Sequence, residues 1–133
     1  MGSGVAADRA ILVGARDLDP PEEVLIDAGL VALVRVGPAM ADELRRLVAG
    51  RPVYVHIDCD VLDAGTVPTG YLSPGGMTLD QLRTTAEVLA ESEVVGIEIG
   101  ELESAEDPCS PPTYLTRLLD ALDPLLRAVC TPR

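Results

Sequence analysis

Three aspartates within six residues are the part of this 133-residue sequence best suited to chemistry. Asp58, Asp60 and Asp63 follow an apolar run, residues 53–57, that the pattern predicts to be a strand covered on both faces. Crowded carboxylates beside a sheet repel one another and lose hydration, and a divalent cation such as Mg²⁺ or Mn²⁺ removes both penalties. Capping and turn formation explain one such aspartate more easily than three. The spacing therefore predicts a metal site, and an extended backbone would place His56, Asp58 and Asp60 on one face.

A second acidic group follows the apolar run 94–99. Most of its carboxylates are expected to be solvated. Glu101 comes where the strand should end, so its carboxylate could point into a crevice and form two parallel hydrogen bonds with a guanidinium or amidinium group. The residue pattern alone favours the solvated interpretation for Glu101 as well. The other members are Glu98, Glu103, Glu106 and Asp107.

The single histidine and the three cysteines exclude a multi-histidine or cysteine–histidine zinc site made from this chain alone. His56 is expected to be a satisfied core histidine or, as the second choice, a group that orients an aspartate, and it is not counted as a metal ligand. Cys59, Cys109 and Cys130 form no CxxC pair, which is typical of reduced thiols in a cytoplasmic protein. Cys59 is expected to be a small buried residue.

The charge balance excludes several classes of partner. The chain has 22 acidic residues against 10 basic ones, a net charge of −12, and it contains no lysine. A surface of this kind argues against nucleic acid and against anionic membrane surfaces. The missing lysine excludes a P-loop and a Schiff base. No apolar run reaches the length of a membrane span, and the charge suits a metal or a cationic ligand.

Short apolar runs alternate with amphipathic stretches, which predicts one α/β domain over residues 1–133, with 1–4 resembling a cloning scar. The right-handed crossovers of a parallel sheet would place the ligand at the carboxyl ends of the strands. Thr78 and Gln81 form a capping box, Asp19 is a plausible N-cap, and Pro124 should kink or split the last helix. Strands are predicted over 11–15, 31–36, 53–57 and 94–99, and helices over 21–28, 38–49, 79–91 and 115–129.

The segment VHIDCDVLDAGTVPTGYLSPGG resembles the signature of the ureohydrolase family, which includes arginases, agmatinases and formimidoylglutamases. VGARDLDPPE resembles the preceding strand and Arg-Asp turn of that family, and IEIGELES resembles its last strand. Order and spacing agree over residues 10–131. Ala64 departs from the proline that is usual in the family, and the loop after Asp63 looks slightly shortened.

This resemblance implies a three-layer α/β/α fold with a mostly parallel sheet, of which this chain holds the C-terminal four strands and their helices. It also implies a site with two Mn²⁺ ions, in which Asp58 bridges both metals and Asp60 binds one, while Glu101 holds the guanidinium of a small cationic guanidino or amidine substrate. The implied reaction is hydrolysis of a linear amidine with release of urea or an analogue. A homo-oligomer is implied as well.

The earlier half of the family, with its Gly-Gly-Asp-His and Asp-Ala-His-x-Asp motifs, has no counterpart here. That half supplies the remaining metal ligands and the general base, so the isolated chain is expected to be inactive and to be a C-terminal fragment. A strand of that half lies between the first and second pairs of strands found here, and its absence leaves unpaired edges. We expect a lone chain to close this gap by new strand pairing, or to associate with a second copy in a strand-exchanged assembly.

Three other functions fit parts of the pattern. A degenerate accessory subunit that keeps the fold and binds a partner is the main alternative, because the histidines are missing. Asp58-Cys59-Asp60-Val61 also fits a phosphohydrolase of the haloacid dehalogenase type, but that chemistry needs a basic group, usually lysine, beside the phosphate. An Asp-x-Asp pair occurs in nucleotide-sugar transferases too, which the acidic balance disfavours most.

Overall fold

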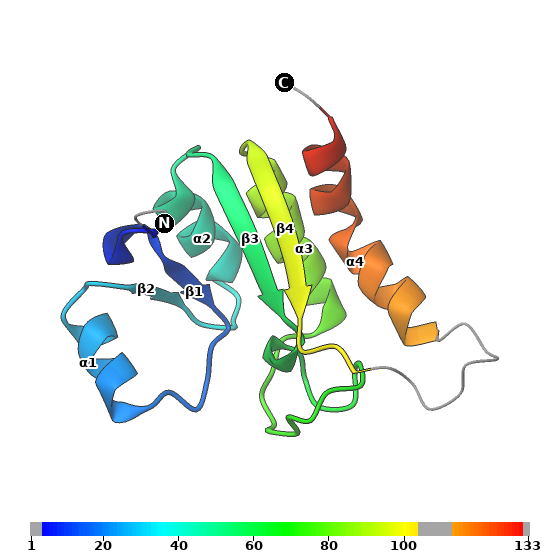
Figure 1. The fold of residues 1–133 in the computed structure, drawn as a ribbon, viewed down its shortest axis with the longest axis horizontal. Coiled ribbons are helices and arrows are strands. Elements are labelled where there is room, and N and C mark those ends of the chain that lie inside the picture. Colours follow the sequence, from blue (N-terminus) through cyan, green and yellow to red (C-terminus); the bar gives the residue numbers. More distant parts are fainter. Residues whose placement is uncertain (1–3, 104–112, 132–133) are drawn as a thin grey trace.

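The computed structural model describes residues 4–103 and 113–131, and they form an α/β fold in the predicted order of elements (Figure 1). Part of the segment resembling a cloning scar, residues 1–3, lies outside this description. The strands are β1 (Ile11–Val13), β2 (Ala32–Val34), β3 (Val53–Asp58) and β4 (Val94–Gly100). The α-helices are α1 (Pro20–Asp27), α2 (Met40–Val48), α3 (Leu79–Ala90) and α4 (Thr113–Cys130), and two 3₁₀ helices are η1 (Ala7–Arg9) and η2 (Cys59–Val61).

The strands form two separate parallel pairs. β1 pairs with β2, so that Leu12 lies opposite Leu33, and β3 pairs with β4, so that Asp58 lies opposite Gly100. No strand pairing joins the two sheets among the described residues. The parallel direction brings the carboxyl ends of β3 and β4 to the same edge, which is where the sequence predicted the site.

An open cleft separates β1 from β3, and we call it the interstrand cleft. It has a volume of about 930 Å³ and is lined along its length by residues of both strands. The Val53 N–H donates to the Glu93 carbonyl at 2.8 Å, on the β4 side. Because peptide groups alternate in direction along a strand, those of Tyr54 and His56 point into the cleft. In the same way, the Gly14 N–H donates to the Val34 carbonyl of β2 at 2.8 Å. The peptide groups of Ile11 and Val13 therefore face the cleft from the opposite wall.

The open cleft corrects one expectation drawn from the sequence. We expected new strand pairing to close the gap in a lone chain, and in this single chain the gap stays open. Closure by new pairing is therefore wrong for the described residues. Association with a second copy, the other outcome considered, stays a prediction.

The core lies on one face of the β3–β4 sheet, where α2 and α3 pack behind the strands (Figure 1). Val55 and Ile57 of β3 are buried there, while Tyr54, His56 and Asp58 on the opposite face are exposed. The prediction of a strand covered on both faces is therefore wrong within the described residues. The helices contribute buried side chains that include Leu44, Leu82, Ala86, Leu118 and Leu122.

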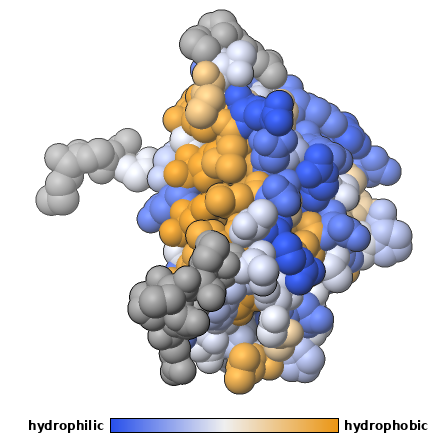
Figure 2. Space-filling model, turned by 90° about the vertical axis from the view of Figure 1, so that its right-hand side faces the viewer, coloured by the Kyte–Doolittle hydropathy of each residue, from blue (hydrophilic) through white to orange (hydrophobic). Residues whose placement is uncertain are grey.

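A second apolar surface lies beyond β4. Figure 2 shows apolar residues gathered on this side of the molecule, next to a strongly polar area. The exposed apolar residues of β4 are Val95 and Ile99, and those of α4 are Leu115, Leu119 and Val129. Of the described strands, β4 pairs with β3 alone, so it also has a free edge.

Local sequence signals explain the helix boundaries. The Thr78 hydroxyl accepts the Gln81 N–H at 3.2 Å and the Gln81 side chain accepts the Thr78 N–H at 2.9 Å, so the predicted capping box is confirmed. At α1 the Glu22 carboxylate accepts the Asp19 N–H at 2.8 Å. None of the described helices is long and apolar enough to cross a membrane.

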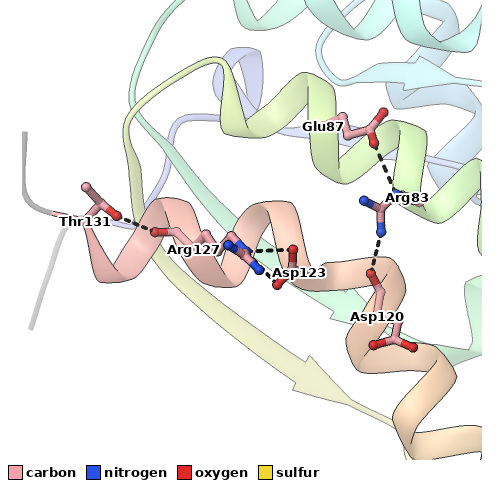
Figure 3. A network of polar contacts seen from close by, with 6 residues as sticks. All are labelled: Arg83, Glu87, Asp120, Asp123, Arg127 and Thr131. Carbon is pink, nitrogen blue, oxygen red and sulfur yellow. Dashed lines mark hydrogen bonds and ion pairs between the residues drawn. The ribbon is translucent and has the colours of Figure 1, made fainter.

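α4 continues through Pro124, so a split of the helix is wrong, while the kink, the other outcome predicted, stays a prediction. Proline has no N–H, and the carbonyl of Asp120, four residues earlier, therefore lacks its usual helical donor. The Arg83 guanidinium on α3 donates to this carbonyl at 2.8 Å and also contacts Glu87 at 3.2 Å (Figure 3). An Arg127–Asp123 ion pair at 2.8 Å lies on the next turn of α4. A side chain of α3 thus replaces the backbone donor that Pro124 removes.

We expect Arg83→Met to lower the free energy of unfolding by about 1 kcal/mol, because the Asp120 carbonyl loses its donor. In a Pro124→Ala background the backbone N–H returns, so the same substitution should cost clearly less. Urea denaturation of the four proteins in this double-mutant cycle measures the difference. An equal loss in both backgrounds would show that Arg83 does not compensate for the proline.

Candidate functional site

The predicted site residues meet at the carboxyl edge of the β3–β4 sheet. Asp58 is the last residue of β3 and lies opposite Gly100 in the strand register. Glu101 follows Gly100 directly, so the structure brings Glu101 and Asp58 to the ends of neighbouring strands. Asp58 and Asp60 also line the interstrand cleft, and Asp17 lines it after the end of β1. Three acidic residues therefore line this cleft, and Glu101 is not among its lining residues.

Asp58 and Asp60 are held differently. The chain leaves the extended conformation after Asp58 and turns into η2, where an Asp58 carboxylate oxygen, Oδ1, accepts the Asp60 N–H at 2.9 Å. The expectation that His56, Asp58 and Asp60 share one face of an extended strand is therefore wrong for Asp60. Asp60 Oδ1 is buried and has no hydrogen-bond partner among the described residues. A buried carboxylate oxygen without a partner is costly, and such an atom calls for a ligand or donor from elsewhere.

Asp63 closes a loop. We call residues 58–77 the acidic loop. The Asp63 N–H donates to the Met77 carbonyl at 2.9 Å, and its carboxylate accepts the Gly76 N–H at 3.3 Å. A Cβ at Gly76 would come within 2.4 Å of the Leu62 backbone, so only glycine allows this approach. The turn-forming role considered from the sequence thus describes Asp63.

Cys59 is buried, and in the sequence it lies between Asp58 and Asp60, whose charges affect its thiol. Burial raises the pKa of the Cys59 thiol, and the charges of Asp58 and Asp60 raise it further. Cys59 is therefore a neutral packing residue at physiological pH, as predicted. Cys130 is exposed and also a free thiol, whereas Cys109 lies outside the described residues.

His56 is not a core residue. Its side chain is 55% exposed on the open face of the sheet, and its Nδ1 lies 3.2 Å from the Glu98 carboxylate. The Tyr54 hydroxyl donates to the same carboxylate at 3.3 Å. The prediction of a satisfied core histidine is therefore wrong, and its partner is a glutamate rather than one of the aspartates.

Glu101 lies beyond the end of β4 with a left-handed backbone, φ 56°, and it is exposed. This conformation is uncommon for a glutamate and marks a position held by its surroundings. Glu98 and Glu103 are exposed as well, as expected for a solvated acidic segment. Glu106 and Asp107 lie outside the described residues.

The donor chemistry at the cleft suits a hard divalent cation in part. Carboxylate oxygens are the ligands that Mn²⁺ and Mg²⁺ prefer, and Asp60 offers a buried oxygen without a partner. However, the part of the chain that the structure describes contains no group of three histidine, cysteine or acidic side chains close enough to hold a metal. The residues present fit a portion of a metal site rather than a whole one.

Sequence reasoning treated Arg16 and Asp17 only as a turn, and it missed their contacts with the acidic loop. Asp17 has a left-handed backbone, φ 53°, and its carboxylate accepts hydrogen bonds from the hydroxyls of Tyr71 and, at 2.7 Å, Ser73. The Ser73 hydrogen bond lowers the pKa of Asp17, and the Tyr71 hydrogen bond and the Arg16 charge lower it further. The signal available in the sequence was the position of this Arg-Asp pair, directly after a predicted strand, at the edge of the sheet where a ligand was expected.

Comparison with known proteins gives a consistent result. The arginase family matches residues 2–122 of the chain. The chain is 34% identical to an N(omega)-hydroxy-L-arginine amidinohydrolase of Streptomyces lavendulae over 127 residues, which is 96% of this chain and 46% of that protein. It is 50% identical to an agmatinase of Bacillus subtilis over 48 residues, or 35% of this chain and 17% of the agmatinase. The chain thus spans at most about half the length of these relatives.

Solved structures show the same fold at lower identity. An arginase of Helicobacter pylori superposes with a TM-score of 0.76 at 18% identity, covering 94% of this chain and 45% of that one. A proclavaminate amidinohydrolase of Streptomyces clavuligerus superposes with a TM-score of 0.65 at 25% identity, covering 92% and 43%. The four strands and their helices therefore correspond to part of the fold of these enzymes.

The contacts of Asp17 predict a pH dependence of stability. Since the pKa of Asp17 is lower in the folded chain than in the unfolded one, its ionised form favours folding. This contribution is present above the unfolded pKa and is lost as the pH falls through the folded value. Asp17→Asn should therefore lower the urea midpoint more at pH 7 than at an acidic pH below 3.8, the ordinary pKa of this carboxyl, where its charge is progressively lost. Asn also tolerates the left-handed backbone, and Asp8→Asn, outside this network, is the control. A loss that is equal at both pH values would contradict the role of the charge.

Proposed function

Because the chain belongs to the arginase family, we propose that it supplies the C-terminal part of the active site of a metal-dependent hydrolase of linear amidines. Its relatives include amidinohydrolases and agmatinases by name. We infer that the remaining ligands and the general base come from residues outside these 133, as the coverage of about half of each relative suggests. The cytoplasm is the compartment we expect for it.

The observation that carries the proposal is the buried, unpartnered carboxylate oxygen of Asp60 at the end of the interstrand cleft. We propose that Asp60 and Asp58 hold Mn²⁺, with two ions in a complete site. Asp58 keeps one oxygen on the Asp60 N–H and has its second oxygen for a metal. A divalent cation at such a site lowers the pKa of a coordinated water and thereby supplies a nucleophile at neutral pH.

Glu101 is the proposed contact for the substrate. Glu101 directly follows the end of β4, which pairs with the end of β3 that carries Asp58. A carboxylate can accept two parallel hydrogen bonds from a planar guanidinium group, which fixes the orientation of the group as well as its position. The net charge of −12 favours the approach of a cationic guanidino compound.

The interstrand cleft is the proposed place of the missing part of the fold. The peptide groups of Ile11, Val13, Tyr54 and His56 point into it, so a strand inserted parallel to β1 and β3 would find hydrogen-bond partners on both sides. Such a strand would end beside Asp17, Asp58 and Asp60, where its last side chains could complete the metal site. In its absence, the open edges and the apolar surface on β4 and α4 favour association between copies.

Titration with MnCl₂, followed by the electron paramagnetic resonance signal of free Mn²⁺, tests the metal site. We expect the isolated chain to bind at most one ion, weakly, because it holds only part of the ligand set. Asp60→Asn should lower the affinity at least about tenfold, whereas Asp80→Asn, an exposed change at the start of α3, should leave it unchanged. Tight binding of two ions by the isolated chain would show a complete site and would contradict the partial one proposed.

Co-expression tests the open cleft. We expect the chain to form a one-to-one complex with the portion of the Streptomyces lavendulae enzyme that it does not match, and to self-associate when produced alone. Sedimentation measures both states, and the complex should bind two Mn²⁺ and release urea-type products from guanidino substrates. Failure to form the complex would contradict the proposed place of the missing strand. A complex without metal binding would favour the accessory, non-catalytic subunit instead.

A further inference from the structure

Arg16 joins the end of β1 to a distant part of the chain. Its guanidinium donates to the carbonyls of Val61 and Leu62, each at 3.2 Å, and to the Ser73 carbonyl at 3.0 Å. These contacts are partly buried and reach across 45 to 57 residues of sequence. One side chain therefore holds both arms of the acidic loop against the strand that forms the opposite wall of the interstrand cleft.

Two of the carbonyls that Arg16 contacts lie next to aspartates of the acidic loop. Val61 and Leu62 stand between Asp60 and Asp63 in the chain. The Val61 carbonyl also accepts the Met77 N–H at 2.8 Å. Arg16 therefore contacts the same backbone segment whose hydrogen bonds close the acidic loop. Because these contacts hold the Val61–Leu62 backbone, Asp60 has little freedom to turn its buried oxygen away from the interstrand cleft.

The aromatic ring of Tyr71 and the carboxylate of Asp17 complete the arrangement. The Arg16 guanidinium carbon lies 4.9 Å from the centre of the Tyr71 ring, and the Tyr71 hydroxyl donates to Asp17. The Arg16 guanidinium is thus held in place by its contact with the Tyr71 ring, by three backbone carbonyls and by the charge of the adjacent Asp17 carboxylate. A planar guanidinium can serve three carbonyls and stack on a ring, whereas an ammonium group is a compact charge that cannot reproduce this fork.

We propose that Arg16 is a positioning residue of the metal site, which holds the Val61–Leu62 backbone so that Asp60 keeps its oxygen at the end of the interstrand cleft. This inference rests on the proposed function, because it assigns Asp60 to a metal. It goes beyond it by giving the Arg-Asp turn, which is far from the metal ligands in sequence, a defined task.

Hydrogen exchange of individual amides tests the contact itself. In Arg16→Lys we expect the Asp63 and Met77 amides, whose hydrogen bonds close the acidic loop, to exchange about tenfold faster, with α3 amides unchanged. Arg51→Lys is the matched control, because Arg51 also donates to two backbone carbonyls, of Leu47 and Val48, but at the end of α2. Unchanged exchange at Asp63 and Met77 in Arg16→Lys would overturn the proposal.

Mn²⁺ binding tests the positioning role, measured in the isolated chain or in the complex, whichever binds the metal. Arg16→Lys should weaken binding about tenfold and alter the resonance spectrum of bound Mn²⁺, while Arg51→Lys should do neither. Faster exchange with unchanged affinity and spectrum would make Arg16 a structural residue only and overturn the inference. If the unaltered protein binds no Mn²⁺ in either form, the proposed function fails, and with it the metal-positioning role, while the exchange data still show whether Arg16 holds the loop.

Discussion

The unpaired peptide groups of β1 and β3 are the constraint on which the rest of this structure depends. A parallel sheet makes its hydrogen bonds between neighbouring strands, and here two pairs of strands stand on either side of a cleft of about 930 Å³. Within each pair the two strands form hydrogen bonds with each other, but the peptide groups that face the cleft have no partner strand among the described residues. The helices α2, α3 and α4 hold the β3–β4 pair through an apolar core, while α1 buries none of its residues. Most of the buried side chains therefore lie around β3 and β4, although Val34 of β2 belongs to the same core.

The carboxyl edge gains its chemistry from the same arrangement. Because β3 and β4 run in the same direction and Asp58 lies opposite Gly100, Asp58 and Glu101 lie at the ends of neighbouring strands although they are far apart in the chain. The backbone then uses two of the three aspartates locally: Asp58 accepts an amide of η2, and Asp63 accepts an amide of the loop. These two hydrogen bonds help to hold the shape of the loop. Asp60 is different, because its buried Oδ1 satisfies nothing in the described residues and is left available.

Much of this was predictable from local sequence patterns, and the failures have physical causes. The order of strands and helices, the capping box of Thr78 and Gln81 and the burial of Cys59 all depend on residues close together in sequence, and all were predicted. The exposure of His56 was not, because a continuous apolar run such as residues 53–57 is typical of a strand covered on both faces, and the covering layer of this face is not among the described residues. The position of Asp60 also escaped prediction, since a 3₁₀ turn after a strand leaves no clear signal in residue periodicity. At Pro124 the Asp120 carbonyl of α4 finds its donor in Arg83, which lies on another helix and is not signalled by the sequence around Pro124.

Arg16 and Arg83 share one physical principle, and it explains why arginine suits a chain without lysine. Each places a guanidinium against backbone carbonyls: those of Val61, Leu62 and Ser73 in the acidic loop in one case, and in the other that of Asp120, whose helical donor is missing because of Pro124. A guanidinium carries five donors in a plane and can serve several carbonyls at once, with less loss of hydration than an ammonium group. In a chain with a net charge of −12, these arginines do not serve mainly to neutralise carboxylates. They hold irregular backbone in place, and at the cleft the backbone they hold is the segment that carries the acidic side chains.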